Sequence, residues 1–106
     1  KYTMTVYVVQ EVKGINLLPA TEYGDIEILL PQGQVAFSTK PTIKRLYTNL
    51  RKYTMDDYLL MIGDPAAIAL ASAVAADIGQ GNLRLLKWDK QERKYFVINA
   101  NLNGGN

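Results

Sequence analysis

The sequence predicts an α/β fold, borderline with α+β: a single mixed β-sheet of five to six strands with two crossover helices, in the order β-β-β-α-β-α-β-β. Three observations predict it. Residues 57–88 pass from a buried strand through a tight turn into an apolar helix, a glycine stop and a second strand, which is the pattern of a βαβ unit. β-branched and aromatic residues lie near the start of the chain, as in strands. Two strand-like segments around a polar loop lie near its end.

The first strands come before any helix. TVYVVQEV at residues 5–12 is rich in β-branched and aromatic residues and predicts a strand. Residues 13–24 carry two glycines and a proline and predict an irregular connection. Strands at 25–30 and 35–38 flank a Pro-Gln-Gly-Gln turn, so we expect residues 25–38 to form a hairpin.

Two helices follow, separated by a buried strand. Pro41 suits the first position of a helix, and an apolar stripe at helical spacing continues to Tyr53. Residues 58–62 (YLLMI) are apolar on both faces, as in a central strand. Asp64 is an N-cap by residue type, and the helix that it starts reaches Ile78 and is apolar nearly all round, so we expect it to be largely covered. Its predicted sheet-facing residues are Ala67, Ile68, Ala71, Val74, Ala75 and Ile78.

A second hairpin, of strands 82–88 and 94–98, closes the sheet. Its apolar residues fall on both faces, and two helices can hardly cover both faces out to that margin. We therefore expect a homo-oligomer, a two-fold dimer. The apolar residues are Leu83, Leu85, Leu86 and Trp88 on one strand and Tyr95, Phe96, Val97 and Ile98 on the other.

The 106 residues fit one domain, expected at residues 1–100, with 101–106 as a disordered C-terminal tail. Met4 is a candidate natural start, with Lys1–Thr3 upstream of it. The longest apolar stretch is far short of a membrane span, and no secretory leader is visible, so no membrane partner is expected. A net charge of +2 is too small to indicate a polyanion partner by itself.

Several chemistries are disfavoured by composition. The chain has no cysteine and no histidine, which removes thiolate chemistry, the commonest general base and the commonest metal ligand. Asp56 and Asp57 are adjacent carboxylates, but no third acid lies near them in the sequence, so we interpret them as a solvated turn. The sequence therefore predicts no catalytic residue, no metal, no cofactor and no enzymatic activity.

Two helix starts are candidate anion sites, because free backbone N–H groups there favour negative charge. The first consists of Ser38, Thr39, Lys40 and Thr42, where a lysine lies at the end of the helix dipole that prefers an anion. The second is Gly63, at the carboxyl end of a central strand, where α/β proteins often bind ligands. Asp64 beside it is interpreted as a structural cap, since its carboxylate would itself occupy those N–H groups.

A basic face over residues 40–53 is a candidate nucleic-acid interface. It contains no acid, and four of its five cations are expected on one side of the helix. Solvated helix faces are commonly charged, so nucleic-acid binding is an alternative and not the favoured function. The five residues are Lys40, Lys44, Arg45, Arg51 and Lys52.

Three segments resemble small proteins of tailed phages, of marine type especially: EYGDIEILLPQGQVAFSTKPTIKRL, LLMIGDPAAIALASAVAADI and LLKWDKQERKYF. The resemblance covers about residues 4–100 and implies expression in the cytoplasm of an infected bacterium. The favoured function is a non-enzymatic interaction protein that acts by self-association or by binding a host or phage protein. The alternatives are a nucleic-acid-binding accessory protein that uses residues 40–53, and a small anion or nucleotide binder at the two helix starts.

Overall fold

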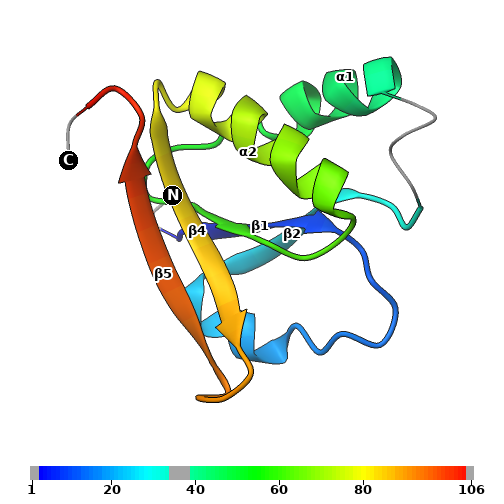
Figure 1. Cartoon of the computed structure of the whole chain (residues 1–106), viewed down its shortest axis with the longest axis vertical. Helices are drawn as coiled ribbons and strands as arrows, with labels where there is room; N and C mark the ends of the chain where they lie inside the picture. The colour runs from blue at the N-terminus through cyan, green and yellow to red at the C-terminus, as the bar shows by residue number, and fades with distance from the viewer. Residues whose placement is uncertain (1–2, 34–38, 105–106) are drawn as a thin grey trace.

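A computed structural model describes residues 3–33 and 39–104 of the chain. Five strands form one mixed sheet in the order β2-β1-β3-β4-β5, with helices between them (Figure 1). The predicted α/β class with a single mixed sheet is confirmed. The strands are β1 (Thr5–Gln10), β2 (Asp25–Leu30), β3 (Tyr58–Leu60), β4 (Asn82–Asp89) and β5 (Lys94–Asn101). The helices are the 3₁₀-helix η1 (Leu18–Tyr23) and the α-helices α1 (Thr39–Asn49) and α2 (Pro65–Ile78).

Three of the four strand pairs are parallel. β1 lies between β2 and β3 and is parallel to both, and β3 is parallel to β4. β4 and β5 form the predicted closing hairpin, in which Leu85 opposes Ile98 and Leu86 opposes Val97. The first strand of the predicted hairpin 25–38 is β2, whereas the predicted strand 35–38 falls outside the described residues.

A parallel β1–β2 pair needs a connection that crosses one face of the sheet. Residues 11–24 make this crossing and contain η1, whereas the sequence predicted only an irregular connection. In Figure 1, α1 and α2 lie above the sheet and η1 lies below it. The sheet therefore has a helix face, covered by α1 and α2, and an η1 face, covered by residues 11–24.

The helix face holds a core that is mostly aliphatic. Successive side chains of a strand point to opposite faces, so Tyr7, Val9 and Leu59 face the helices. The predicted sheet-facing residues of α2 pack as expected: Ala67, Ala71, Val74 and Ala75 are buried, and Ile68 and Ile78 pack against them. The other buried members of this core are Leu29, Leu30, Leu46, Leu50 and Tyr53.

The η1 face holds a core that is rich in tyrosine. Val6, Val8, Leu60 and Leu86 are buried there, with Ala20 of η1 above them. Tyr23 makes edge-to-face contacts with Tyr58 and Tyr95, with ring centroids 5.4 and 6.3 Å apart. The Arg84 guanidinium lies 4.2 Å from the centroid of the Tyr58 ring. Aromatic rings therefore fill on this face the volume that helical side chains fill on the other.

Two expectations about the helices need correction. α1 ends at Asn49 and not near Tyr53, so the residues from Leu50 onward lie in a turn, although Tyr53 is buried. The outer side of α2 is not covered by the described residues, since Ala66, Ala69 and Ala73 are exposed. Alanine side chains are small, so their exposure to water costs little.

The expected disordered tail also differs from the structure over residues 101–104. Asn101 is the last residue of β5, and the N–H of Leu102 donates to the carbonyl of Gly81 at 2.8 Å. The Asn103 side chain donates to the carbonyl of Gln80. Backbone and side-chain hydrogen bonds thus fix this segment to the end of α2. Residues 105–106 lie outside the described part of the chain.

Candidate functional site

The strand order contains a topological switch point between β1 and β3. β1 and β3 are neighbours in the sheet, but the chain continues from β1 to β2 in one direction along the sheet and from β3 to β4 in the opposite direction. In open α/β sheets, the crevice at the carboxyl ends of two such strands is the usual place for a ligand. Here those ends are Gln10 and the residues after Leu60.

The side chain of Gln10 lies in this crevice. It is buried, and its Nε2 donates to the carbonyls of Pro31, at 2.9 Å, and of Gly33. Its Oε1 accepts from the N–H of Asp64 at 2.8 Å. One carboxamide therefore ties the end of β1 both to the turn after β2 and to the start of α2. Gln10 was not among the predicted site residues; the available signal was a polar residue at the end of an otherwise apolar strand.

The second predicted anion site is occupied by the protein's own groups. Asp64 is the N-cap of α2, and its Oδ1 accepts from the N–H of Ala66 at 3.1 Å. The N–H of Asp64 donates to Gln10, and Pro65 has no N–H to offer. Gly63 has φ +130°, and an added Cβ would lie 2.6 Å from the Cβ of Gln10. Gly63 thus allows the close approach of Gln10, and the donors nearest to it are already engaged.

The first predicted anion site is described only in part. Thr39 and Lys40 are the first two residues of α1 and are exposed, and Thr42 is half-buried. Ser38 lies outside the described residues. A ligand role for this group stays a prediction.

The prediction that four of the five basic residues share one helix face is wrong, because α1 ends at Asn49. Lys40, Lys44 and Arg45 are exposed on α1. Arg51 and Lys52 lie in the turn after the helix, where they line a hollow of about 350 Å³ together with the acids Glu27 and Asp57. The basic residues are therefore split into two groups, and one of them is next to carboxylates. This arrangement lowers the positive potential that a polyanion would meet.

Asp57 is a buried structural residue and not part of a solvated turn. Its Oδ1 accepts from the N–H of Thr5, and its Oδ2 accepts from the N–H and Oγ1 of Thr54. Asp56 beside it is exposed. Burial, together with the negative charges of Asp57 and Glu27, raises the pKa of Tyr7 to about 12. Three donors on one carboxylate explain why Asp57 can be buried at the start of β3.

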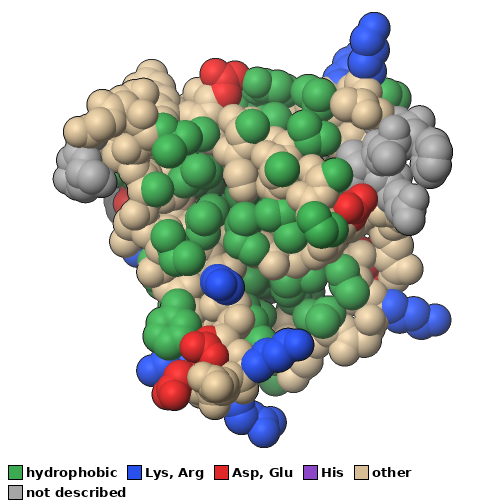
Figure 2. Space-filling view, viewed as in Figure 1, with side chains coloured by type: hydrophobic (Ala, Val, Ile, Leu, Met, Phe, Trp, Pro, Cys, Tyr) green, Lys and Arg blue, Asp and Glu red, His purple; other side chains and the backbone are tan. Residues whose placement is uncertain are grey.

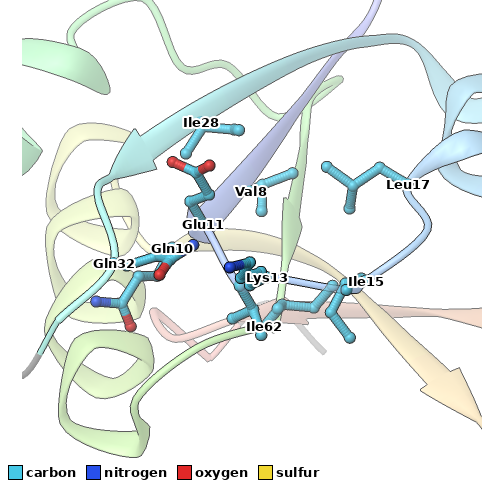
Figure 3. Close-up of a pocket in the computed structure, with 11 residues that line it drawn as sticks. Val8, Gln10, Glu11, Lys13, Ile15, Leu17, Ile28, Gln32 and Ile62 are labelled. Atoms are coloured by element: carbon cyan, nitrogen blue, oxygen red, sulfur yellow. The ribbon is translucent and has the colours of Figure 1, made fainter.

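An open pocket of about 490 Å³ lies on the η1 face at the same carboxyl end of the sheet (Figure 3). Val8 and Ile28, which are paired across β1 and β2, contribute to its apolar lining together with Leu17 and Ile62. Glu11 and Lys13, on the segment that follows β1, are its charged residues. Gln10 also contributes to the lining, so the pocket adjoins the hydrogen-bonded Gln10 side chain at the switch point.

Neither a metal cluster nor a membrane helix is found in residues 3–33 and 39–104. No group of three His, Cys, Asp or Glu residues there is placed to hold a metal ion. No helix there has both the length and the apolar character needed to cross a bilayer.

Comparison with known proteins places the chain in a family. No curated protein and no solved structure matches it. A family model described as Phage Pam3 gp32-like protein matches residues 4–102, which is nearly the whole chain. The predicted resemblance to small phage proteins is confirmed. The chain belongs to the Phage Pam3 gp32-like protein family.

Proposed function

We propose that the protein is a non-enzymatic interaction protein whose edge strand β5 pairs with β5 of a second copy. The observation that carries the proposal is the exposure of three consecutive apolar residues on this edge. Phe96, Val97 and Ile98 are 41, 39 and 43% exposed, and they alternate between the two faces of the sheet. A long, apolar edge strand without proline is a template for another strand.

The surface beside this edge is also apolar. Figure 2 shows hydrophobic side chains that continue from α2 onto the β4–β5 hairpin, with most charged side chains at the periphery. Phe96 and Ile98 lie on this helix face, because Ile98 opposes Leu85, which packs against the helix-face core. The exposed alanines of α2 lie on the same side of the sheet. A second copy would therefore cover both an edge and the apolar surface beside it.

The sequence of β5 favours one register for antiparallel pairing. A two-fold axis normal to the sheet at Val97 places Val97 opposite itself and Phe96 opposite the partner's Ile98. The same axis places Lys94 opposite Ala100, so no like charges meet. An axis at Ile98 would instead oppose Val97 to Asn99 and Phe96 to Ala100, which matches apolar residues less well.

Analytical ultracentrifugation over a concentration series tests the association. We expect a dimer for the native chain and a folded monomer for Ile98→Lys, because an edge lysine blocks strand pairing. Ile28→Lys is the matched control, since Ile28 is 42% exposed on the opposite edge strand β2. It should remain a dimer. A native chain that is monomeric at high micromolar concentration would contradict the proposal.

Single-cysteine variants test the register, and the absence of native cysteine makes them unambiguous. Val97→Cys should form a disulfide-linked dimer on mild oxidation, because directly opposed Cα atoms in an antiparallel pair are about 4.5–5.5 Å apart. Asn99→Cys is exposed on the same face but should not cross-link, because its counterpart would be offset by four residues, or ~14 Å. Cross-linking through residue 99 alone would place the axis elsewhere on β5.

A further inference from the structure

The pocket on the η1 face exists because the connection above it is short. η1 has six residues and packs over β1 and β2, whereas the helix face is covered by helices of 11 and 14 residues. At the carboxyl end of the sheet, residues 11–17 pass beside the strands as an irregular, mostly exposed segment. This leaves a hollow of about 490 Å³, which is within the size range of small-molecule sites.

The lining of the pocket is aliphatic inside and charged outside. Val8, Ile28 and Ile62 come from three adjacent strands or their ends, and Leu17 faces them from the connection. Figure 3 shows these side chains around the hollow and the side chains of Glu11 and Lys13 on the segment after β1. Among the described residues, no aromatic side chain lines this pocket, so the lining favours an aliphatic group over a planar ring. The lining fits a branched aliphatic group.

The two charges define the rest of the ligand. Glu11 and Lys13 are exposed, and neither side chain has an ion pair or hydrogen bond with the described residues. The Glu11 carboxylate complements a positive group on a ligand, and the Lys13 ammonium complements a negative group. A ligand that carries one group of each kind fits both. The α2 N-terminus at the same edge is capped by Asp64, which disfavours phosphate. A molecule with a net negative charge would also meet Glu11.

We propose that this pocket binds a small zwitterion with an aliphatic side chain, that is, a free aliphatic α-amino acid. The ammonium of the ligand contacts Glu11, its carboxylate contacts Lys13, and its side chain lies against Val8, Ile28 and Ile62. Val97 does not line the pocket, and the inference does not depend on self-association.

Amide chemical-shift titrations of the full chain test this assignment with four probes. L-leucine carries all three groups, isoamylamine lacks the carboxylate, isocaproate lacks the ammonium, and glycine lacks the side chain. We expect L-leucine to give saturable shifts in residues 11–17 and at Ile62, and each other probe to bind about tenfold or more weakly, as expected for one lost charge-assisted contact or the lost side chain.

Two charge-neutral variants assign the contacts. Glu11→Gln should weaken L-leucine binding about tenfold without weakening isocaproate binding, because isocaproate has no ammonium for Glu11 to contact. Lys13→Gln should likewise weaken L-leucine binding about tenfold without weakening isoamylamine binding, because isoamylamine has no carboxylate. Lys87→Gln is the control for loss of a surface charge and should bind L-leucine as the native chain does. Both contact residues are exposed, so the variants should fold.

Three results would overturn the proposal. The first is the absence of saturable shifts with L-leucine at tens of millimolar. The second is equal binding of L-leucine, isoamylamine and isocaproate, which would show an apolar hollow without recognition of the charges. The third is unchanged L-leucine binding in Glu11→Gln and Lys13→Gln, which would place the ligand at another surface.

Discussion

The two faces of the sheet are covered in different ways by one chain. On the helix face, α1 and α2 bury a continuous, mostly aliphatic core along β1, β2 and β3. On the η1 face, a short 3₁₀-helix and a set of tyrosine rings cover the middle of the sheet and leave its carboxyl end open. How completely each face of the sheet is covered therefore follows from the length and regularity of the connections that cross it. At the carboxyl ends of β1 and β2, the face with the shorter crossover is the one that keeps an open pocket.

The largest expected effect comes from a charge placed in the helix-face core. Ala71 is fully buried on α2, so Ala71→Glu should lower the free energy of unfolding by about 3–5 kcal/mol, because the carboxylate would be buried without a partner. Urea denaturation measures this change. Ala73→Glu, on the exposed side of the same helix, should change stability by about 0.5 kcal/mol or less. Equal effects at both positions would show that α2 does not pack on the sheet as described.

Adjacent residues of β3 compare the two faces directly. Leu59 faces the helices and Leu60 faces η1, and both side chains are completely buried. Each Leu→Ala change should cost about 2–5 kcal/mol. We expect Leu59→Ala to cost more, because packed helices collapse into a cavity less readily than the side chains beside an open pocket do. Urea denaturation of both variants measures the two losses in the free energy of unfolding. A larger loss for Leu60→Ala would contradict the expectation that the helix face is packed more rigidly than the η1 face.

The helix face was predictable from sequence because its signals are local. The spacing of Ala67, Ala71, Val74 and Ala75 alone places one side of α2 on the sheet. Asp64 and Pro65 mark the start of the same helix by residue type. These features depend on neighbours within one or two helical turns, so they can be read without the tertiary structure.

The η1 face and the switch point were not predictable in the same way. Residues 11–24 have no helical periodicity, and only the parallel pairing of β1 with β2 shows that they cross a face. Gln10 contacts Pro31, Gly33 and Asp64, which are 21 or more positions away in the sequence. The end of α1 was misplaced because Tyr53 continues the apolar spacing although it is buried from a turn. Such long-range contacts depend on strand order, which no local pattern encodes.

Two glycines with the same backbone angle test the packing of Gln10 at the switch point. Gly63 and Gly33 have φ +130° and +131°, so an alanine at either position costs about 1–3 kcal/mol of backbone strain. Gly63→Ala should cost a further ~1–3 kcal/mol, because its Cβ would clash with the Gln10 side chain, whereas a Cβ at Gly33 meets nothing within 4 Å. Chemical denaturation of both variants gives the difference. Equal costs would show that Gln10 moves aside without loss of stability.

The smallest effect is confined to alkaline pH and compares a tyrosine from each face. The pKa of Tyr7, on the helix face, is raised from 10.0 to about 12 by burial and by Asp57 and Glu27, and burial alone raises the pKa of Tyr95 on the η1 face. The folded chain keeps these protons at a pH where the unfolded chain has lost them. The resulting stability is therefore fully present below pH 10 and is lost as the pH rises through the folded pKa.

Tyr7→Phe should therefore flatten the alkaline decrease in stability, and Tyr95→Phe should flatten it less because no carboxylate raises the pKa of Tyr95 further. The measurement is the free energy of unfolding by urea at a series of pH values from neutral to strongly alkaline. If Tyr7→Phe and the native chain lose stability in parallel across that series, the proton on Tyr7 does not contribute. The alkaline sensitivity would then have to be assigned to the other tyrosines whose pKa is raised, Tyr23, Tyr47, Tyr53 and Tyr95.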